Sequence, residues 1–329
     1  MRRREFIAAM GGAAAAFPAS SWAQQGPLRR LGVLLVYGEQ HPDAPLMVGT
    51  LKDSLQRLGW IEGQTLAIDL RYAGGQPELV RRYTDEILAH KPEVVFAQGV
   101  VGAAAMQRAT NTVPVVFIQV QDPVGGGFVS SLSRPGANLT GFTNFEYSFV
   151  GKWLELLKEL SPRTTRALAI INPDNHARFA GYSAALERAT LGLGIQATAG
   201  GVHDGPAIER ALVSLAQTPN GGLLVLPDAT TGLHGKLIVD LAAQLGLPAV
   251  FAYSAPVRLG GLAAYTNSVA EDAQRAAGYI DRLLRGAKVS DLPVQASERF
   301  ETVINLRTGA ALGLTISPSL LARADEVIE

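Results

Sequence analysis

The chain has 329 residues, 29 of them basic and 29 acidic, and it contains no cysteine. This length suits two domains of ordinary size, and a hydrophobic fraction of 47% is typical of a packed globular protein rather than a disordered one. The balanced charge gives no global field for holding nucleic acid or an anionic membrane, and the absence of cysteine excludes disulfides, zinc–thiolate sites and a catalytic thiol.

The first 23 residues have the pattern of an export signal. A basic start precedes an apolar run at 6–17 that is too short to span a bilayer, and Ser21 and Ala23 are the small residues expected before a cleavage position. The RREFI stretch at 3–7 also fits the twin-arginine pattern, so the export route stays open between that route and the general one. We therefore predict a signal peptide at 1–23, cleavage after about Ala23 and a periplasmic location.

Short apolar runs alternate with stretches of helical period over the first half of the mature chain. The apolar runs predict strands at 31–36, 66–72, 94–98 and 115–120. The helical stretches predict helices at 45–58 and 76–90, and a third helix of small residues that begins near Gly102. Strands separated by helices of this length indicate a parallel sheet covered on both faces.

The same pattern begins again after a polar connection at 133–145 and a helix at 147–160. Strands are predicted at 166–171, 195–200, 222–227 and 248–253, and a tail adds a strand at 260–267, a helix at 268–285 and a strand at 300–306. The fold class is therefore α/β, with two doubly wound parallel-sheet lobes. We assign 28–140 plus about 262–290 to the N-terminal lobe, and 145–255 plus about 298–325 to the C-terminal lobe. Because the tail must pack on lobes that are already complete, the chain crosses between them more than once, and several crossings form a hinge.

Ligands of open parallel sheets bind beyond the carboxyl ends of the strands, and two facing lobes place two such edges around one site. The polar or aromatic positions after the strands and the helix start after Gly99 give the candidate ligand-binding residues, which are Tyr37, Gln98, Gly99, Val100, Val101, Gln121, Asp122, Pro123, Phe145, Asn172, Asn175, Asp228 and Tyr253. Asp122 has two readings that stay open. It binds a ligand ammonium group, a hydroxyl or the opposite lobe, or it caps the turn before Pro123.

Catalytic and cofactor motifs are weak or missing. The five histidines are scattered without metal-ligand spacing, and the GVVGAAA stretch at 99–105 is a poor dinucleotide fingerprint. No phosphate-binding GxxxxGK[ST] loop occurs, and GYSAA at 181–185 lies inside a predicted helix rather than at a strand-to-helix elbow. We therefore predict no metal, no cofactor and no catalytic residue.

Five stretches together carry a family resemblance. They are RLGWIEGQTLAIDLRYAGGQ (57–76), VQDPV (120–124), LSRPGANLTG (132–141), NP (172–173) and ETVINLRTGAALGLTISPSLLARADEVIE (301–329). The mature chain resembles the substrate-binding proteins of ABC transporters, in the group that includes the tryptophan-type binding proteins. The resemblance implies the type I periplasmic binding fold, no cofactor, and delivery of ligand to a membrane permease driven by an ATPase.

The resemblance also assigns parts of the site. It matches Asp122 and Pro123 to the family's first-lobe lip, and Asn172 and Pro173 to its second-lobe lip. Family members often carry small hydroxyl residues after the third strand, where this chain has Val100 and Val101, so the pocket wall is expected to be more apolar. Tyr37, Phe145 and Tyr253 could still stack on an aromatic ring.

The predicted function is a monomeric periplasmic receptor that closes on a small organic solute, with an amino-acid-like or aromatic ligand favoured and no nucleic acid bound. The alternative is a ligand-sensing receptor with the same fold that acts on a signalling complex containing a membrane kinase. An exported α/β enzyme would need a nucleophile–base pair between the lobes, which the sequence does not offer.

Overall fold

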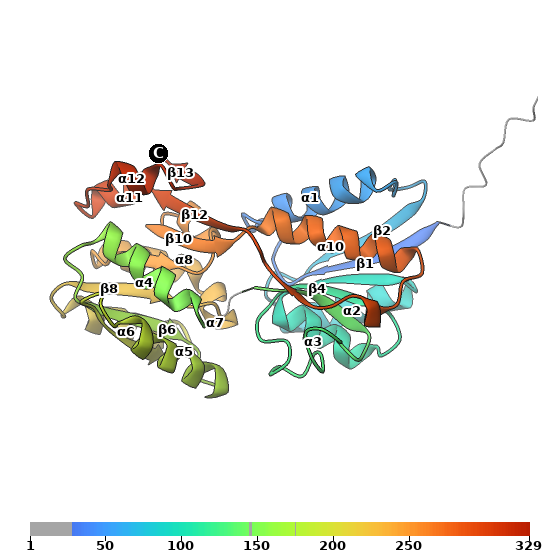
Figure 1. Ribbon diagram of the computed structural model, residues 1–329, viewed down its shortest axis with the longest axis horizontal. Helices are drawn as coiled ribbons and strands as arrows, with labels where there is room; N and C mark the ends of the chain where they lie inside the picture. The colour runs from blue at the N-terminus through green and yellow to red at the C-terminus, as the bar shows by residue number, and fades with distance from the viewer. Residues whose placement is uncertain (1–27, 145–146, 175) are drawn as a thin grey trace, which may run out of the picture.

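The structure is a computed structural model that describes residues 28–144, 147–174 and 176–329. The predicted signal peptide at 1–23 and two predicted site residues, Phe145 and Asn175, lie outside this range. Two α/β lobes lie side by side along the long axis, each built around its own sheet (Figure 1). This arrangement confirms the predicted fold class of two parallel-sheet lobes.

The first lobe contains a six-stranded sheet in the order β11-β5-β4-β3-β1-β2, and every pairing in it is parallel. Its strands are β1 (Arg29–Leu35), β2 (Leu66–Tyr72), β3 (Val94–Gln98), β4 (Val115–Val120), β5 (Leu139–Thr143) and β11 (Gln295–Ala296). The first five strands form a 2-1-3-4-5 sheet, in which the direction of winding changes between β1 and β3.

Helices cover both faces of this sheet, and their apolar residues form two separate cores. On one face lie α1 (Ala44–Arg57) and α10 (Val269–Leu284), which bring residues such as Met47, Leu51 and Ile280 onto the sheet. On the other face lie α2 (Pro77–Ala89) and α3 (Gly99–Ala109). The short 3-10 helix η1 (Val289–Asp291) follows α10. The apolar runs of the strands are therefore buried on both sides, as their composition predicts.

The second lobe contains a seven-stranded sheet in the order β13-β12-β10-β9-β8-β6-β7. Its strands are β6 (Arg166–Ile171), β7 (Gln196–Gly201), β8 (Gly221–Val225), β9 (Ala249–Phe251), β10 (Ala263–Asn267), β12 (Phe300–Asn305) and β13 (Glu326–Ile328). β10 and β12 pair antiparallel, and the other pairings are parallel. The winding changes direction between β6 and β8, which repeats the arrangement of the first lobe.

The helices of the second lobe also lie on both faces of their sheet. They are α4 (Phe149–Leu160), α5 (His176–Ala189), α6 (Gly205–Ala216), α7 (Ala229–Leu233), α8 (Gly235–Gln244), α9 (Ala255–Arg258), α11 (Leu306–Ala311) and α12 (Pro318–Leu321). Trp153 of α4 and Tyr182 of α5 belong to the core on one face, and Ile208 of α6 and Ile238 of α8 belong to the core on the other. In the part of the chain that the structure describes, no helix combines the length and apolar character needed to cross a membrane.

The chain passes between the lobes at three places. The first crossing follows β5 and leads to α4, the second follows β10 and leads to α10, and the third connects β11 with β12. The sequence had placed 262–267 in the N-terminal lobe, but β10 pairs with β9 and β12 in the second sheet. The second crossing therefore falls at Ser268, because the buried residues of β10 complete the sheet of the second lobe before the chain leaves it.

Two other boundaries differ from the prediction. α3 begins at Gly99 rather than near Gly102, since Gln98 is extended and occupies the N-cap position. The stretch predicted as part of a polar connection contains β5, which is fully buried beside β4. Gly141 permits this pairing, because its φ is 152° and a Cβ atom there would lie 1.9 Å from the carbonyl oxygen of Phe117.

Candidate functional site

Four of the predicted site residues lie where the winding of each sheet changes direction, while Gln121, Asp122 and Pro123 follow β4 and Tyr253 follows β9. In the first lobe, Tyr37 follows β1 and Gln98 ends β3, so both lie at the β1/β3 switch point. In the second lobe, Asn172 follows β6 and Asp228 follows β8, at the β6/β8 switch point. Open α/β sheets bind ligands at such points, because the adjacent connections leave the sheet in opposite directions and open a space between them.

Gln98 organises the first-lobe edge from within. Its side-chain oxygen accepts hydrogen bonds from the backbone N–H groups of Val36 and Tyr37, at 3.0 and 3.4 Å. Its amide nitrogen donates to Oε1 of Gln119 at 2.8 Å, and the Tyr37 hydroxyl donates to the same oxygen at 3.2 Å. Gln98 is buried and fully engaged, so its part in the site is to hold β1, β3 and β4 in register at their ends.

The end of β4 explains why a buried strand stops at a cluster of polar residues. Its pairing with β5 is interrupted between Phe117 and Val120, and Gln119 within that interruption has a φ of 56°. A bulge of this kind turns a side chain away from the direction that the regular pleat would give it. It brings the buried Gln119 amide to Tyr37 and Gln98.

Asp122 forms the turn that follows the strand. Its Oδ1 accepts a hydrogen bond from the backbone N–H of Gly125 at 2.9 Å, and its own φ is 42°. Pro123 is buried beneath this turn, and its carbonyl accepts from the N–H of Phe128 at 2.9 Å. The turn-capping role is thus present in the structure. Asp122 is exposed, and a role of its carboxylate in ligand binding stays a prediction.

Gln121 and Tyr253 connect the two lobes directly. The Gln121 side chain donates from Nε2 to the Tyr253 hydroxyl at 3.3 Å. Burial raises the pKa of Tyr253 to about 12, while the charge of Arg178 acts in the opposite direction. The hydroxyl therefore stays protonated at neutral pH and can donate a hydrogen bond of its own.

The second-lobe edge is held by local polar contacts. Asn172 donates from Nδ2 to the Thr230 hydroxyl at 2.9 Å and accepts from the N–H of Asp174 at 2.8 Å. Asp228 caps α7 by accepting from the N–H of Thr230 at 2.8 Å, and its other oxygen lies 3.7 Å from Nη1 of Arg178. Asp228 and Arg178 are mostly buried as a pair, which brings a guanidinium group to the second-lobe edge.

Aromatic rings lie beside these polar groups. Tyr37 stacks on His41 with ring centroids 3.6 Å apart and planes 5° apart, and Tyr147 meets Tyr182 edge to face at 5.0 Å. Burial is the main cause that raises the pKa of Tyr37, and burial lowers the pKa of His41, which favours its neutral imidazole. Burial and the nearby carboxylate of Asp122 raise the pKa of Tyr147. The Asp122 turn of the first lobe is therefore close enough to the Tyr147 ring of the second lobe for its charge to act on the hydroxyl.

The buried amide of Gln121 keeps its Oε1 without a hydrogen bond to any described residue, and the buried amide of Asn144 lies beside it with a side-chain hydrogen bond to Tyr253. The two residues are 6% and 2% exposed. Gln121 follows β4 and Asn144 follows β5, so the two lie at neighbouring strand ends beside the first crossing. A buried amide that lacks a partner costs about 1–3 kcal/mol, and this cost is removed when a hydrogen-bonding group binds there.

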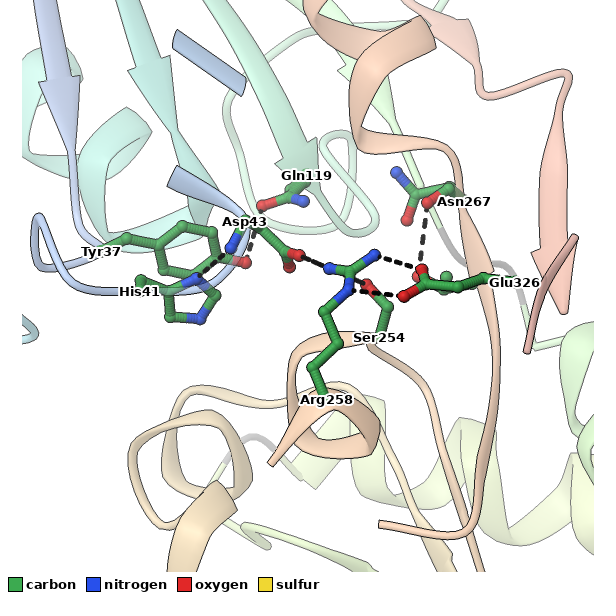
Figure 2. Close-up of polar contacts among 9 residues, drawn as sticks. Tyr37, His41, Asp43, Gln119, Ser254, Arg258, Asn267 and Glu326 are labelled. Atoms are coloured by element: carbon green, nitrogen blue, oxygen red, sulfur yellow. Dashed lines mark hydrogen bonds and ion pairs between the residues drawn. The ribbon is translucent and has the colours of Figure 1, made fainter. Parts of the chain in front are cut away.

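A charged cluster, which we call the lobe latch, lies at the same interface and consists of Asp43, Ser254, Arg258 and Glu326 (Figure 2). Arg258 of α9 contacts Oδ1 of Asp43, just before α1 of the other lobe, at 2.5 Å, and it contacts Oε2 of Glu326 in β13 at 2.7 Å. Ser254 donates to Asp43 at 3.4 Å. Asp43 is only 2% exposed, so its side chain is shielded from water and lies against these second-lobe partners.

The remaining predicted residues have simpler surroundings. Gly99, with a φ of 75°, opens α3, Val100 is half-buried, and Val101 is 38% exposed. Within the described residues, no group of three or more His, Asp or Glu side chains could hold a metal ion.

The sequence did not indicate several residues of this interface. Gln119 could have been noticed, since it is the one polar residue in the VVFIQV run. Asp43, Arg178 and Arg258 carried no such signal, because each lies on a helix or near a helix start and looks like an ordinary surface charge until the lobes are brought together.

The comparisons with known proteins agree with this arrangement. The family model described as ABC transporter substrate binding protein matches residues 36–328. A tyrosine-binding protein of Clostridioides difficile (strain R20291) is 24% identical over 278 residues, which cover 84% of this chain and 79% of that protein.

Solved structures share the fold over nearly their whole length. An ABC domain from Streptococcus pneumonia in complex with L-Trp matches with a TM-score of 0.80 and 24% identity, over 92% of this chain and all of that one. A conserved domain protein from Vibrio cholerae matches at 0.79 and 25% identity, over 91% of this chain and 99% of that one. A ligand-free, open substrate-binding protein with adhesive properties from Clostridium difficile matches at 0.71 and 24% identity, over 92% and 99%. The chain belongs to the ABC transporter substrate-binding protein family, with the two-lobed type I periplasmic binding fold.

Proposed function

We propose that this protein is a periplasmic receptor that closes its two lobes on an amino acid with an aromatic side chain and delivers it to the permease of an ABC importer. The protein works as a monomer with the permease and its ATPase as partners. It makes and breaks no covalent bond in the ligand and needs no cofactor.

The buried amides of Gln121 and Asn144, with Oε1 of Gln121 left without a partner, are the observation that carries this proposal. Gln121 offers a free acceptor beside the Tyr253 hydroxyl of the other lobe, and the Asn144 amide, which also contacts Tyr253, can accept and donate. An amino acid presents an ammonium group that donates and a carboxylate that accepts, so one small molecule satisfies both kinds of atom. Hydrogen bonds that involve a charged group stabilise a complex by about 1.5–3 kcal/mol each.

Support for an aromatic ligand comes from the surroundings and from relatives. The half-buried rings of Tyr37, Tyr147 and Tyr253 and the apolar side chains of Val100 and Val101 suit a flat ring more than a sugar. One relative is named for tyrosine and one similar structure holds L-Trp.

A thermal-shift screen on residues 24–329 tests the proposal. We expect L-tryptophan, L-tyrosine or L-phenylalanine to raise the melting temperature, because a ligand at 100 times its Kd stabilises the folded state by about 2.7 kcal/mol. Arabinose serves as a comparison, since it lacks both charged groups and a ring. If none of the twenty amino acids stabilises the protein or binds in calorimetry, the ligand class is wrong.

A variant at Gln121 tests whether the ligand binds at the interface between the lobes. We expect Gln121→Leu to weaken binding of the best amino acid by about 5–100-fold, since it removes one hydrogen bond in a buried site. Gln56→Leu is the matched control, because Gln56 is an exposed glutamine on α1. Equal affinities for the wild type and Gln121→Leu would place the ligand elsewhere.

A further inference from the structure

Three crossings of the chain meet at one buried carboxylate. Asp272 lies in the first turn of α10, directly after the second crossing, and it is 1% exposed. Its Oδ2 accepts from Nδ2 of Asn267, the last residue of β10. Its Oδ1 accepts from the hydroxyl of Ser297, in the third crossing, at 2.7 Å.

Ser297 extends the connection to the first crossing. Its backbone N–H donates to the carbonyl of Thr143 at 3.0 Å, and Thr143 is the last residue of β5, where the first crossing begins. The second and third crossings also touch directly, because the N–H of Ser268 donates to the carbonyl of Arg299 at 3.0 Å. The side chain of Asp272 is thus the centre of a network that reaches every crossing between the lobes.

The hydrogen bonds of this network can change when a proton is added. Oδ1 of Asn267 is buried and has no partner among the described residues. An ionised Asp272 can only accept, whereas a protonated Asp272 can also donate. Rotation of the Asn267 amide would then present its free oxygen to the Asp272 O–H, so the second crossing has two hydrogen-bonding states.

Few other charges act on Asp272. Arg275 lies one turn later on α10 and is engaged with Gln295 of β11 and Glu298 of the third crossing. Glu271 accepts from the N–H of Arg299. The strand ends and the crossing that contact the network contribute Thr143, Asn267 and Ser297, which do not titrate. Burial raises the pKa of Asp272 to about 7, and the bonds from Ser297 and Asn267 and the charge of Arg275 limit the increase.

We propose that Asp272 is a protonation switch in the hinge, which couples the three crossings and sets the equilibrium between lobes in contact and lobes apart. The consequence for ligand affinity rests on the proposed function, but the switch itself does not. Separation of the lobes moves the crossings relative to one another and lets water reach the carboxylate. Since water favours the ionised form, the carboxyl group ionises at lower pH when the lobes are apart than when they are in contact. A rise in pH toward 7 therefore shifts the equilibrium toward separated lobes, and a further rise has no effect because both states are then ionised.

A ligand-free distance measurement tests the switch. The chain lacks cysteine, so Gln56→Cys on α1 and Gln244→Cys on α8 give one spin label on each lobe. We expect the mean distance between labels to increase from pH 5 to about 7, as the ratio of separated to contacting lobes rises by up to tenfold per pH unit, and to stay constant from there to pH 8.5. Asp272→Asn should abolish this change, and Asp281→Asn, on the same helix, should keep it.

A second variant keeps the test independent of how well Asp272→Asn folds. Ser297→Ala removes a hydrogen bond that favours the ionised form, so the pH at which the increase in distance levels off should move upward. A distance that does not vary with pH in the wild type, or a change that persists in Asp272→Asn, overturns the switch.

The same proteins with L-tryptophan as probe test the link to binding. The affinity should fall by up to tenfold per unit as the pH rises toward 7, and then level off, in the wild type and in Asp281→Asn, but not in Asp272→Asn. If L-tryptophan does not bind, the proposed ligand class fails while the distance measurement still decides the switch.

Discussion

At the scale of one residue, the ionised form of Asp272 destabilises the folded protein, because the buried carboxylate loses the hydration that stabilises it in water. The folded protein raises its pKa from the ordinary 3.8 to about 7, mainly by burial. The folded state therefore binds the proton more tightly than the unfolded state does. The resulting stability is fully present below the unfolded pKa and is lost as the pH rises through the folded pKa.

This sign gives a measurable stability profile. One pKa unit corresponds to about 1.36 kcal/mol, so the wild type should lose about 3 kcal/mol of unfolding free energy between pH 5 and 8.5 relative to Asp272→Asn. Urea unfolding at several pH values measures the difference. A constant difference between the two proteins over this range would show that Asp272 keeps an ordinary pKa in the folded state.

At the scale of the element, each lobe was predictable because its strands are continuous apolar runs bounded by turn residues. LAIDLRY, VVFAQ and VVFIQV gave β2, β3 and β4 within a residue. The strand ends also gave Tyr37, Gln121 and Tyr253, since the carboxyl edge of a parallel sheet follows from the order of elements.

Other elements were not predictable, for reasons that lie in tertiary packing. β5 reads as a polar connection because LTGFT is short and contains a glycine, and it is a strand only because Gly141 fits against β4. The lobe latch brings Asp43 to Arg258 across 215 positions of sequence, and no local pattern encodes such a pairing.

The lobe latch predicts that ligand affinity depends on the ion pair between Arg258 and Asp43. We expect Arg258→Ala to weaken binding of the proposed amino-acid ligand by about 10–100-fold, because Asp43 would be left buried without its cation when the lobes meet. Loss of one partner of a buried pair costs about 3–5 kcal/mol, and the partial exposure of Arg258 reduces that figure. Calorimetry measures the affinity, and X-ray scattering should show a larger radius of gyration without ligand.

Two further variants isolate the pair from general effects. Asp43→Asn should recover part of the affinity in the Arg258→Ala background, since the uncompensated charge is gone. Arg285→Ala removes an ion pair with Asp281 at the C-terminal end of α10 and should leave the affinity unchanged. If the double variant is no better than Arg258→Ala, the effect of Arg258 does not pass through Asp43.

At the scale of the whole molecule, the order of the chain does not follow the division into lobes. α10 comes after every strand of the second sheet except β12 and β13, yet it packs with α1 on the first sheet (Figure 1). Ala276 and Ile280 of α10 share a core with Phe96, Ile118 and Phe142. The first lobe is therefore complete only when the chain has returned to it.

This topology predicts that the first lobe cannot fold from its contiguous segment. A fragment of residues 28–143 would expose the face that α10 covers. Burial of each large apolar side chain contributes about 1.5–3 kcal/mol, so the loss of several is comparable with the whole stability of a domain, on the order of 5–15 kcal/mol.

A second fragment, in which a glycine–serine linker joins 28–143 to 268–297, restores the helix and β11. We expect cooperative thermal unfolding by circular dichroism for the joined fragment alone. Cooperative unfolding of 28–143 by itself would mean that the first lobe can fold without α10 and β11.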